Sequence, residues 1–358
     1  MKGSARLAPP VEPMLAKLAR DLPESDDVLY EPKWDGFRCI IFRDGDDVDM
    51  RSRNQRPLAR YFPELVDALR ALRPGNFVVD GEIVVIAPKP FDFSALLQRL
   101  HPAKSRVERL AKETPAAFIA FDLLAIADED VTRRPLRDRR ELLDELLGTV
   151  EPPLYITPST TDVGIAKGWL ARAQGGGADG VIAKGLGSPY VCGKRSIVKV
   201  KHERTADCVI AGFRWDRNEP VIGSLLLGIY DGAGILHHIG LASSFTRSRR
   251  KELVPEVIGH VTELEGHPWA NGFELRAGAV GRLPGAASRW AEGGDITWVP
   301  LRPALVAEVA YDHLELDRLR HPARFKRWRP DRDPSTCTFD QFEEASGAEL
   351  MELLVGRR

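Results

Sequence analysis

The sequence predicts an α+β domain followed by a smaller domain built mainly of strands. The chain has 358 residues, and domains of roughly 100–200 residues make two the favoured number. Over the first two hundred residues, β-rich runs mix with helical patterns without regular strand–helix alternation, which is typical of α+β proteins with antiparallel sheets. Beyond that point strands predominate. We therefore expect one domain over residues 1–204 and a second over residues 205–358.

The first domain contains a series of β-rich runs, each bounded by turn or polar residues. They lie at residues 28–33, 37–42, 77–86, 118–126, 180–184 and 197–201. Trp34, Asp35 and Gly36 form a tight-turn signal between the first two runs, so we expect a β-hairpin there. Apolar residues at helical spacing predict helices over residues 58–72 and 136–147.

Short strands dominate the second domain, at residues 208–214, 225–230, 235–241 and 305–311. Thr246 is placed to cap a helix that runs to about residue 261, and Pro255 should kink or split that helix. The glycine-rich segment 271–294 is expected to be a long loop, and the tail from residue 338 a helix. About 150 residues with several short strands and one helix fit a small barrel such as an OB-fold.

Composition and charge exclude several classes of protein. With 43% hydrophobic residues the chain can bury a core, and no apolar run approaches the ~18 residues of a membrane-spanning helix. Lys and Arg number 51 against 52 for Asp and Glu, so any nucleic-acid surface must gather its positive charge on one face. The 4 cysteines form no CxxC pair, and the N-terminus lacks a secretory signal. We expect a reduced, cytoplasmic protein without a zinc site.

The stretch from Glu31 to Arg38 carries the strongest chemical signal. Lys33 ends one predicted strand and is followed by a glycine turn and Arg38, which together could hold a phosphate. Taken alone, this string is equally compatible with an exposed hairpin. More charged residues follow inside or beside β-rich runs, namely Arg53, Glu82, Asp122, Asp179, Lys184, Lys199 and Lys201. Because buried charges need partners, their repetition predicts a pocket that holds a nucleotide and a divalent metal. Asp80 is expected to be a turn residue.

These motifs, in this order, resemble those of the ATP-dependent DNA ligases, a family of covalent nucleotidyltransferases. The resemblance covers roughly residues 12–335 and is greatest to compact stand-alone bacterial enzymes of the mycobacterial ligase C type. In the second domain it rests on residues 298–300, 305–311, 319–322 and 329–332. It implies a nucleotidyltransferase (adenylation) domain followed by an OB-fold domain, with the organisation of a minimal ligase.

The resemblance also implies the chemistry of the pocket. Lys33 would attack the α-phosphate of ATP and carry AMP covalently. Lys199 and Lys201 would contact the phosphates during catalysis. Asp179, together with Glu82, would hold Mg²⁺, with Mn²⁺ as an alternative ion. The family usually has Glu at the position of Asp179, but the shorter carboxylate can still bind metal.

Further residues would bind the nucleotide, again by resemblance. Glu31 would read the adenine and Phe121 would stack on it, while Glu82 would accept a hydrogen bond from the ribose. Arg38 and Arg53 would contact ribose and phosphate, and Lys184 would neighbour the base or the phosphates.

The resemblance assigns the C-terminal motif, Arg329, Asp331 and Arg332, to orienting pyrophosphate, although the family usually has Lys in place of Arg332. This motif ends a basic cluster of Arg318, Arg320, Arg324, Lys326, Arg327, Arg329 and Arg332. A hinge at residues 202–206 would let the second domain turn another surface to DNA. The expected partner is nicked duplex DNA, with a repair polymerase or end-binding proteins as further partners. We expect a monomer with no membrane association.

Two alternatives remain open from the sequence. An RNA ligase or a GTP-using capping enzyme would share the fold and the pocket motifs. A non-catalytic DNA adaptor with an OB-fold and a relic pocket would have lost the nucleophile or the carboxylates. Lys33, Glu82 and Lys199 are all present, which disfavours the adaptor.

Overall fold

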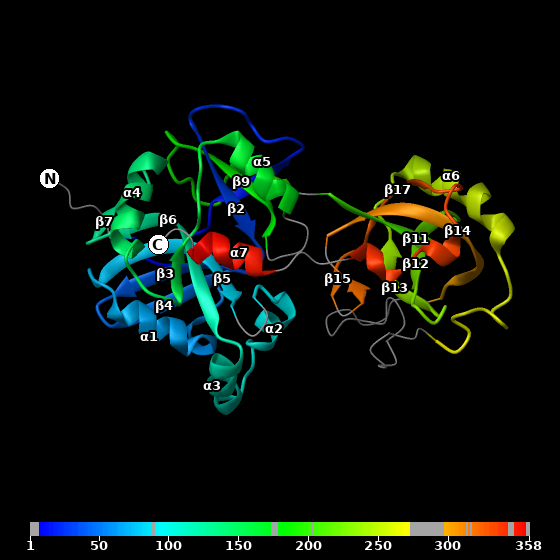
Figure 1. Cartoon of the computed structure of the whole chain (residues 1–358), viewed down its shortest axis with the longest axis horizontal. Coiled ribbons are helices and arrows are strands. Elements are labelled where there is room, and N and C mark those ends of the chain that lie inside the picture. Colours follow the sequence, from blue (N-terminus) through cyan, green and yellow to red (C-terminus); the bar gives the residue numbers. More distant parts are fainter. Residues whose placement is uncertain are drawn as a thin grey trace. The chain divides into compact units, whose positions relative to one another are not determined.

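The structure is a computed structural model that describes residues 7–86, 90–172, 178–201, 203–272, 297–312, 314–315, 317–342 and 347–355. The chain forms two compact units, Met1–His202 with Glu344–Arg358, and Glu203–Glu343 (Figure 1). The division near residue 203 lies close to the expected boundary. The tail differs, because the C-terminal helix belongs to the first unit and not to the second. No helix in the described ranges has the length and apolar character needed to cross a membrane.

Two sheets make up the first unit. One has the order β1-β10-β9-β2, with β1 (Leu15–Ala19) parallel to β10 (Arg195–Lys201), and β9 (Ala178–Gly185) and β2 (Val28–Trp34) antiparallel. The other has the order β4-β3-β5-β6-β7 and comprises β4 (Asp47–Ser52), β3 (Phe37–Asp44), β5 (Asn76–Val85), β6 (Ala116–Ile126) and β7 (Glu129–Asp130). A short strand, β8 (Leu154–Ile156), pairs with β6 in parallel.

The expected hairpin between the first two strands is wrong. β2 pairs with β9 in one sheet, whereas β3 pairs with β4 and β5 in the other. The turn at Gly36 therefore carries the chain from one sheet to the next. A Cβ atom at Gly36 would collide with the carbonyl oxygen of Ile83, so only glycine allows this close passage beside β5. The turn signal marks a change of direction, but it does not choose the strand partner.

Helices cover the sheets of the first unit. They are η1 (Ala59–Tyr61), α1 (Pro63–Ala71), α2 (Phe93–Gln98), α3 (Lys104–Glu113), α4 (Leu136–Leu147) and α5 (Val163–Arg172). Leu65 and Leu69 of α1 and Leu143 of α4 are buried in the core beneath the β5–β6 sheet. The helix predicted at residues 136–147 is confirmed. The one predicted at residues 58–72 begins as a 3₁₀ turn, and α1 starts at Pro63, a residue suited to the first helical turn.

The C-terminal helix, α7 (Gly347–Val355), packs on the first unit (Figure 1). Leu353 joins the apolar cluster that contains Tyr30 and Trp169. Leu354 is 3% exposed and joins the cluster around Trp34, the residue that follows Lys33. The last helix of the chain thus supports the strand that ends beside the expected nucleophile.

The second unit is built on an antiparallel sheet of order β13-β12-β11-β14-β17. Its strands are β11 (Arg204–Trp215), β12 (Ile222–Tyr230), β13 (Leu236–Ala242), β14 (Val299–Tyr311) and β17 (Arg324–Trp328), and β15 (Leu314–Glu315) pairs with β16 (Arg318–Leu319). Phe213, Leu226 and Trp269 are buried in its core. Short 3₁₀ turns, η3 (Pro334–Thr336) and η4 (Phe339–Phe342), follow β17.

The helix of the second unit begins where the sequence predicts. Thr246 caps α6 (Arg247–Val257) by accepting a hydrogen bond from the backbone of Arg249. The helix ends two residues after Pro255 and continues as the 3₁₀ turn η2 (Ile258–His260). Most of the expected loop 271–294 lies outside the described residues.

Candidate active site

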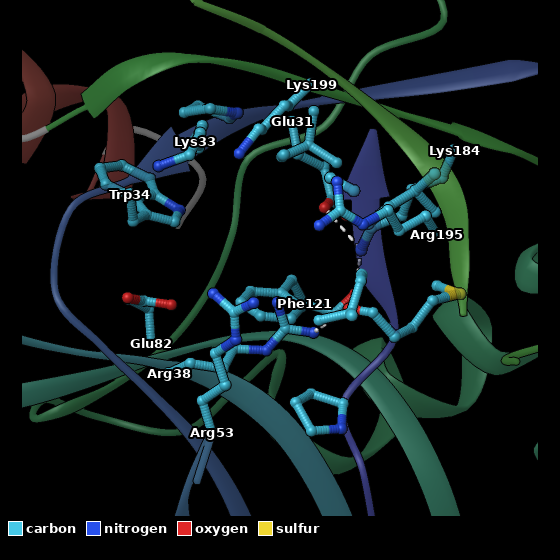
Figure 2. Close-up of a pocket in the computed structure, with 17 residues that line it drawn as sticks. Glu31, Lys33, Trp34, Arg38, Arg53, Glu82, Phe121, Lys184, Arg195 and Lys199 are labelled. Carbon is cyan, nitrogen blue, oxygen red and sulfur yellow. Dashed lines mark hydrogen bonds and ion pairs between the residues drawn. The ribbon is translucent and has the colours of Figure 1, made fainter. Parts of the chain in front are cut away.

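A pocket of about 240 Å³ is lined by residues from both sheets of the first unit (Figure 2). Glu31, Lys33, Lys184 and Lys199 come from the β10-β9-β2 side, whereas Arg38, Glu82 and Phe121 come from the β3-β5-β6 side. Other lining residues are Pro13, Met14, Leu15, Ala16, Pro32, Trp34, Arg53, Ile182, Arg195 and Ile197. Every nucleotide-binding residue expected in the first domain lines this pocket except Lys201. The expected metal ligand Asp179 does not line it either, but Asp179 forms ion pairs with both Lys201 and the lining residue Lys33.

Lys33 is held at the pocket by an acidic partner. Its Nζ lies 2.6 Å from the Oδ1 of Asp179, and the Nζ of Lys201 lies 2.9 Å from the Oδ2. Burial acts to raise the pKa of Asp179, but the two ammonium groups outweigh it and lower the pKa below its ordinary value. Asp179 is therefore an ionised carboxylate between two lysines. The adjacent Gly180 has a φ of 155°, and a Cβ there would collide with the carbonyl of Val200 on β10.

Two further pocket residues have shifted pKa values. Burial and the positive charges of Lys33 and Lys201 lower the pKa of Lys199. Burial raises the pKa of Glu82 to about 8, although Arg38 and Lys33 act in the opposite direction. The lysine side of the pocket thus concentrates positive charge, as a site for phosphates requires.

Arg38 is fixed at the opposite side of the pocket. Its Nε and Nη2 donate to the two carboxylate oxygens of Asp80 at 2.6 and 2.5 Å. Its guanidinium lies 4.4 Å from the centre of the Phe121 ring. Asp80 was expected to be a turn residue, but it is fully buried within β5, at a bulge in the pairing with β6. The Asp80 carboxylate is therefore the ion-pair partner that holds the Arg38 guanidinium in place.

Glu31 is 2% exposed and lies between two cations. Lys184 Nζ approaches Oε2 at 2.7 Å, and Arg140 Nη1 donates to Oε1 at 3.2 Å. Arg140 also donates to the carbonyl of Thr157 at 2.6 Å, and Lys184 donates to the carbonyl of Phe121 at 3.0 Å. Glu31, Lys184 and the Phe121 backbone thus form one connected wall of the pocket.

The carboxylates of the pocket fit a magnesium ion. Mg²⁺ takes oxygen ligands and commonly uses one or two carboxylates together with substrate phosphates. Asp179 supplies an ionised carboxylate beside Lys33, and Glu82 supplies a second carboxyl group on the pocket wall. Within the described ranges, no group of three or more His, Cys, Asp or Glu side chains could form an all-protein cage. An ion here would therefore complete its coordination with water and with phosphate oxygens of the nucleotide.

The C-terminal motif lies in the second unit, where it is tied to acidic residues. Arg329 Nη1 donates to both carboxylate oxygens of Asp207 at 2.9 Å, and its Nε and Nη2 donate to Asp331 at 2.8–3.2 Å. Hydrogen bonds from Arg329 lower the pKa of Asp331 to about 2. Arg332 Nε lies 3.5 Å from Asp207. The motif is thus held together by alternating charges.

Much of the neighbouring basic cluster is also paired within the second unit. Arg324 and Lys326 form ion pairs with Glu203, and Arg327 donates to Glu308 at 2.7 Å. The cluster is therefore partly neutralised by acidic residues of the same unit.

Several pocket residues could not be found from the sequence. Residues 13–16, called the rim, line one part of the pocket, and Arg195, which pairs with Leu15, lines it from β10. Trp34 lines the wall, where its Nε1 donates to Thr157 Oγ1 at 2.9 Å and its ring stacks on Phe91. The rim has no distinctive pattern, and one arginine in a basic run gives no usable signal.

Comparisons with known proteins match both units. A family model described as "ATP dependent DNA ligase domain" covers residues 13–201, and another described as "ATP dependent DNA ligase C terminal region" covers residues 218–332. DNA ligase C2 of Mycolicibacterium smegmatis is 49% identical, over 94% of this chain and 95% of its own length. DNA ligase C of Mycobacterium tuberculosis is 48% identical, over 98% of each.

A solved structure supports the same fold. A chain from a structural study of Lig E DNA ligases has a TM-score of 0.54 and 18% identity, over 89% of this chain and 99% of that chain. The expectation of an α+β adenylation domain with a C-terminal ligase OB-fold domain is confirmed. The matched models span both units, and relatives nearly half identical match almost end to end. The chain therefore belongs to the ATP-dependent DNA ligases.

Proposed function

We propose that this chain seals nicks between a 5′-phosphate and a 3′-hydroxyl in duplex DNA through a lysyl–AMP intermediate on Lys33. In the first step the Lys33 nitrogen, once it has lost a proton, forms a bond to the α-phosphorus of ATP, and pyrophosphate leaves. In the second, a 5′-phosphate oxygen of the nick attacks the same phosphorus and releases the lysine. In the third, the 3′-hydroxyl attacks the nick phosphate, AMP leaves, and the phosphodiester bond is complete.

The observation that carries this proposal is the position of Lys33 in a charged pocket. Its amine lies 2.6 Å from Asp179 and shares the pocket with Lys199 and Arg38. Cations around the α-phosphate would stabilise the negative charge that develops there. A lysine in a merely structural ion pair would not need further cations and an aromatic ring within one 240 Å³ pocket.

The remaining pocket residues divide between base, sugar and phosphate. Phe121 would stack on the adenine and Glu31 would help to read it, with Lys184 next to both. Glu82 would bind the ribose, and Arg38 and Arg53 would bind ribose and phosphate. Arg38 lies over the Phe121 ring and is anchored by Asp80, and Lys184 Nζ also lies 4.8 Å from the centre of that ring. The adenine would therefore use ring surface that these two cations leave open.

Mg²⁺ would be held by Asp179, and by Glu82 once that group is ionised, and would offset charge on the phosphates. Mn²⁺ would meet the same oxygen ligands. Arg329, Asp331 and Arg332 would orient the pyrophosphate during the first step. The second unit, joined to the first near residues 202–206, would then present another surface to duplex DNA. We propose a monomer that acts in DNA repair.

Covalent labelling tests the proposal. The protein is incubated with α-³²P-ATP and MgCl₂, and the labelled protein is then mixed with excess unlabelled nicked duplex. We expect label on the wild type and on Lys104→Ala, a control at a side chain 90% exposed, but none on Lys33→Ala. The label should pass to DNA and leave as AMP as the nick closes. Labelling of Lys33→Ala, label that stays on the protein, or a preference for GTP would contradict the proposal.

A further inference from the structure

Four residues from distant parts of the first unit form a closed ring of hydrogen bonds beside the pocket. The Tyr190 hydroxyl donates to Asp80 Oδ2 at 2.6 Å and accepts the backbone N–H of Met14 at 2.9 Å. Asp80 Oδ2 also accepts Arg38 Nη2 at 2.5 Å. Arg38 Nη2 donates in turn to the Met14 carbonyl at 3.4 Å, which closes the ring.

Burial makes this ring hard to rearrange. Asp80 is 0% exposed and Tyr190 is 5% exposed, and a buried carboxylate is costly when a partner is removed. Burial, and next the negative charge of Asp80, raise the pKa of Tyr190 well above its ordinary value. The phenol therefore keeps its single proton, which goes to Asp80, while an oxygen lone pair accepts from Met14.

The ring reaches the pocket at two places. Arg38 and Met14 both line it, whereas Asp80 and Tyr190 lie behind them. Met14 belongs to the rim of residues 13–16, and its N–H and C=O are both engaged by the ring. Tyr190 connects this rim with Asp80 through two hydrogen bonds of 2.9 and 2.6 Å, which are shorter than the direct 3.4 Å contact from Arg38 to the Met14 carbonyl.

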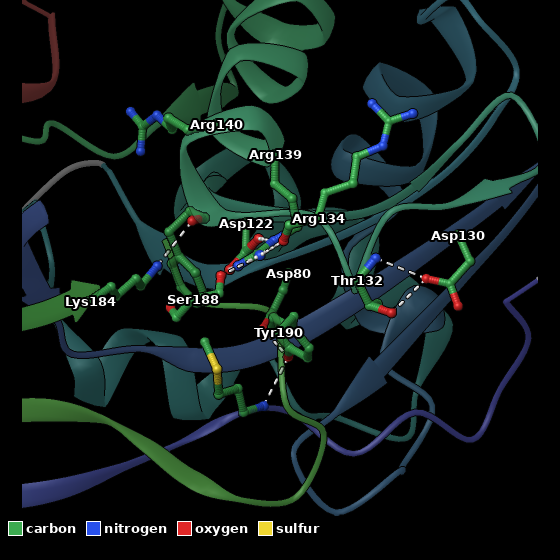
Figure 3. A network of polar contacts seen from close by, with 12 residues as sticks. Asp80, Asp122, Asp130, Thr132, Arg134, Arg139, Arg140, Lys184, Ser188 and Tyr190 are labelled. Carbon is green, nitrogen blue, oxygen red and sulfur yellow. Dashed lines mark hydrogen bonds and ion pairs between the residues drawn. The ribbon is translucent and has the colours of Figure 1, made fainter. Parts of the chain in front are cut away.

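Tyr190 is itself held by its loop between β9 and β10 (Figure 3). Its backbone N–H donates to the Thr132 carbonyl at 2.8 Å. Arg139 of α4 donates to the Ser188 carbonyl at 3.0 Å and lies 6.0 Å from the centre of the Tyr190 ring. Arg139 also donates to both oxygens of Asp122 at 2.8 and 3.0 Å, and Asp122 follows Phe121. Arg139 thus contacts both the loop that carries Tyr190 and the residue that follows Phe121 in the pocket.

We propose that Tyr190 is a positioning residue for nucleotide binding. It holds the Met14 rim and, through Asp80, the Arg38 guanidinium in the geometry that the nucleotide meets. The inference rests on the proposed function, because Arg38 and the rim are assigned to the nucleotide there. Tyr190 does not touch the reacting atoms, so its loss should weaken ATP binding more than the rate of the step that follows.

Tyr190→Phe keeps the aromatic side chain and removes both hydrogen bonds of the hydroxyl group. Tyr30→Phe is the matched control, since Tyr30 is equally buried and its hydroxyl donates to the Pro23 carbonyl, away from the pocket. Single-turnover labelling with α-³²P-ATP is measured against ATP concentration. For Tyr190→Phe we expect a half-saturating concentration about 3- to 10-fold higher, with a limiting rate within about twofold. Tyr30→Phe should match the wild type in both.

The outcomes separate the two proposals. A wild type that takes up no label would contradict the lysyl–AMP mechanism itself. A labelled wild type with unchanged half-saturation for Tyr190→Phe would overturn the positioning role alone. An equal increase in both variants would also overturn it, because the effect would then follow from general loosening.

Hydrogen exchange supplies a second readout that needs no catalysis. In Tyr190→Phe the Met14 amide loses its acceptor, so its exchange should be about tenfold faster or more. In Tyr30→Phe it should not change. If the Met14 amide of Tyr190→Phe exchanged at the wild-type rate, the Tyr190 hydroxyl would not hold the rim.

Discussion

Lys33 and Lys201 each form an ion pair with a different oxygen of the Asp179 carboxylate, with N–O distances of 2.6 and 2.9 Å. The expected nucleophile and an expected phosphate ligand are therefore linked before any nucleotide binds. Asp179 is one residue from Gly180, whose backbone lies against Val200 next to Lys201. The register of β9 against β10, with Gly180 opposite Lys201, places these groups together.

Asp179→Asn tests how much this link stabilises the fold. The lowered pKa of Asp179 means that the ionised form stabilises the protein at neutral pH. This contribution begins to decline as pH falls below about 4 and is lost as pH falls through the lowered pKa. The lysines are partly exposed, so we expect a loss of about 1–2 kcal/mol in the free energy of unfolding at pH 7. The loss should be smaller at pH 3.5 than at pH 7, as measured by urea denaturation.

Asp49→Asn is the matched control, because Asp49 pairs with Arg51 at the surface. It should change the free energy of unfolding by less than about 0.5 kcal/mol at either pH. A deficit in Asp179→Asn that is equally large at pH 3.5 would mean that the carboxylate charge is not the cause.

Glu82 predicts the opposite dependence on pH. Burial raises its pKa to about 8, so the neutral form stabilises the fold, and this contribution is lost as pH rises from its ordinary value of about 4.3 through 8. Glu82→Gln does not ionise. The free energy of unfolding of the variant minus that of the wild type should therefore rise by about 1–2 kcal/mol from pH 5 to pH 8.5, after allowance for partial exposure.

The measurement is urea denaturation in the presence of a chelator, because a bound cation would favour ionised Glu82. Glu108→Gln is the control, since Glu108 is 58% exposed and pairs along its helix with Lys104. The difference in the free energy of unfolding between Glu108→Gln and the wild type should stay constant from pH 5 to pH 8.5. A constant difference for Glu82→Gln as well would show that Glu82 ionises normally.

The sequence predicted the pocket better than the framework behind it. Lys33, Glu82 and Lys199 each lie in a short motif within a strand, so the local pattern already marks them. Tyr190 and Asp80 are 110 positions apart, and Arg140 and Glu31 are 109 apart. A local pattern contains nothing that selects one buried tyrosine or arginine for a carboxylate so far along the chain.

Two other differences have the same origin. The turn at Gly36 was predicted correctly as a change of direction, but the strands on either side join different sheets. The amphipathic pattern of the tail predicts a helix, and α7 is one, but a pattern of apolar residues does not name the surface they cover. Strand partners and helix contacts are set by long-range packing, which a single sequence expresses only weakly.

Leu354→Ala tests the contact between α7 and the first unit. Leu354 is 3% exposed in the cluster that contains Trp34, and large-to-small changes at buried sites cost about 2–3 kcal/mol. The variant should lose that amount in the free energy of unfolding by urea denaturation. Val355→Ala, at a neighbour 45% exposed on the same helix, should stay within about 0.5 kcal/mol. Equal losses for the two variants would exclude specific docking through Leu354.

The C-terminal motif should act in one step of the reaction and not in another. Arg329 links Asp207 and Asp331 within the second unit, so the motif is a preformed group of charges. If it orients pyrophosphate, Asp331→Ala should slow lysyl–AMP formation about 10- to 100-fold. Sealing of a nick that already carries AMP releases no pyrophosphate, so it should change by less than about threefold.

Quenched-flow assays measure the two steps separately, with ATP in one and pre-adenylylated nicked duplex in the other. Asp340→Ala removes another exposed carboxylate of the same unit, one that accepts a hydrogen bond from the nearby Thr338. It should leave both rates near those of the wild type. If Asp331→Ala slowed both steps equally, the motif would serve the fold of the second unit or its contact with DNA, because only a role confined to pyrophosphate predicts a difference between the steps.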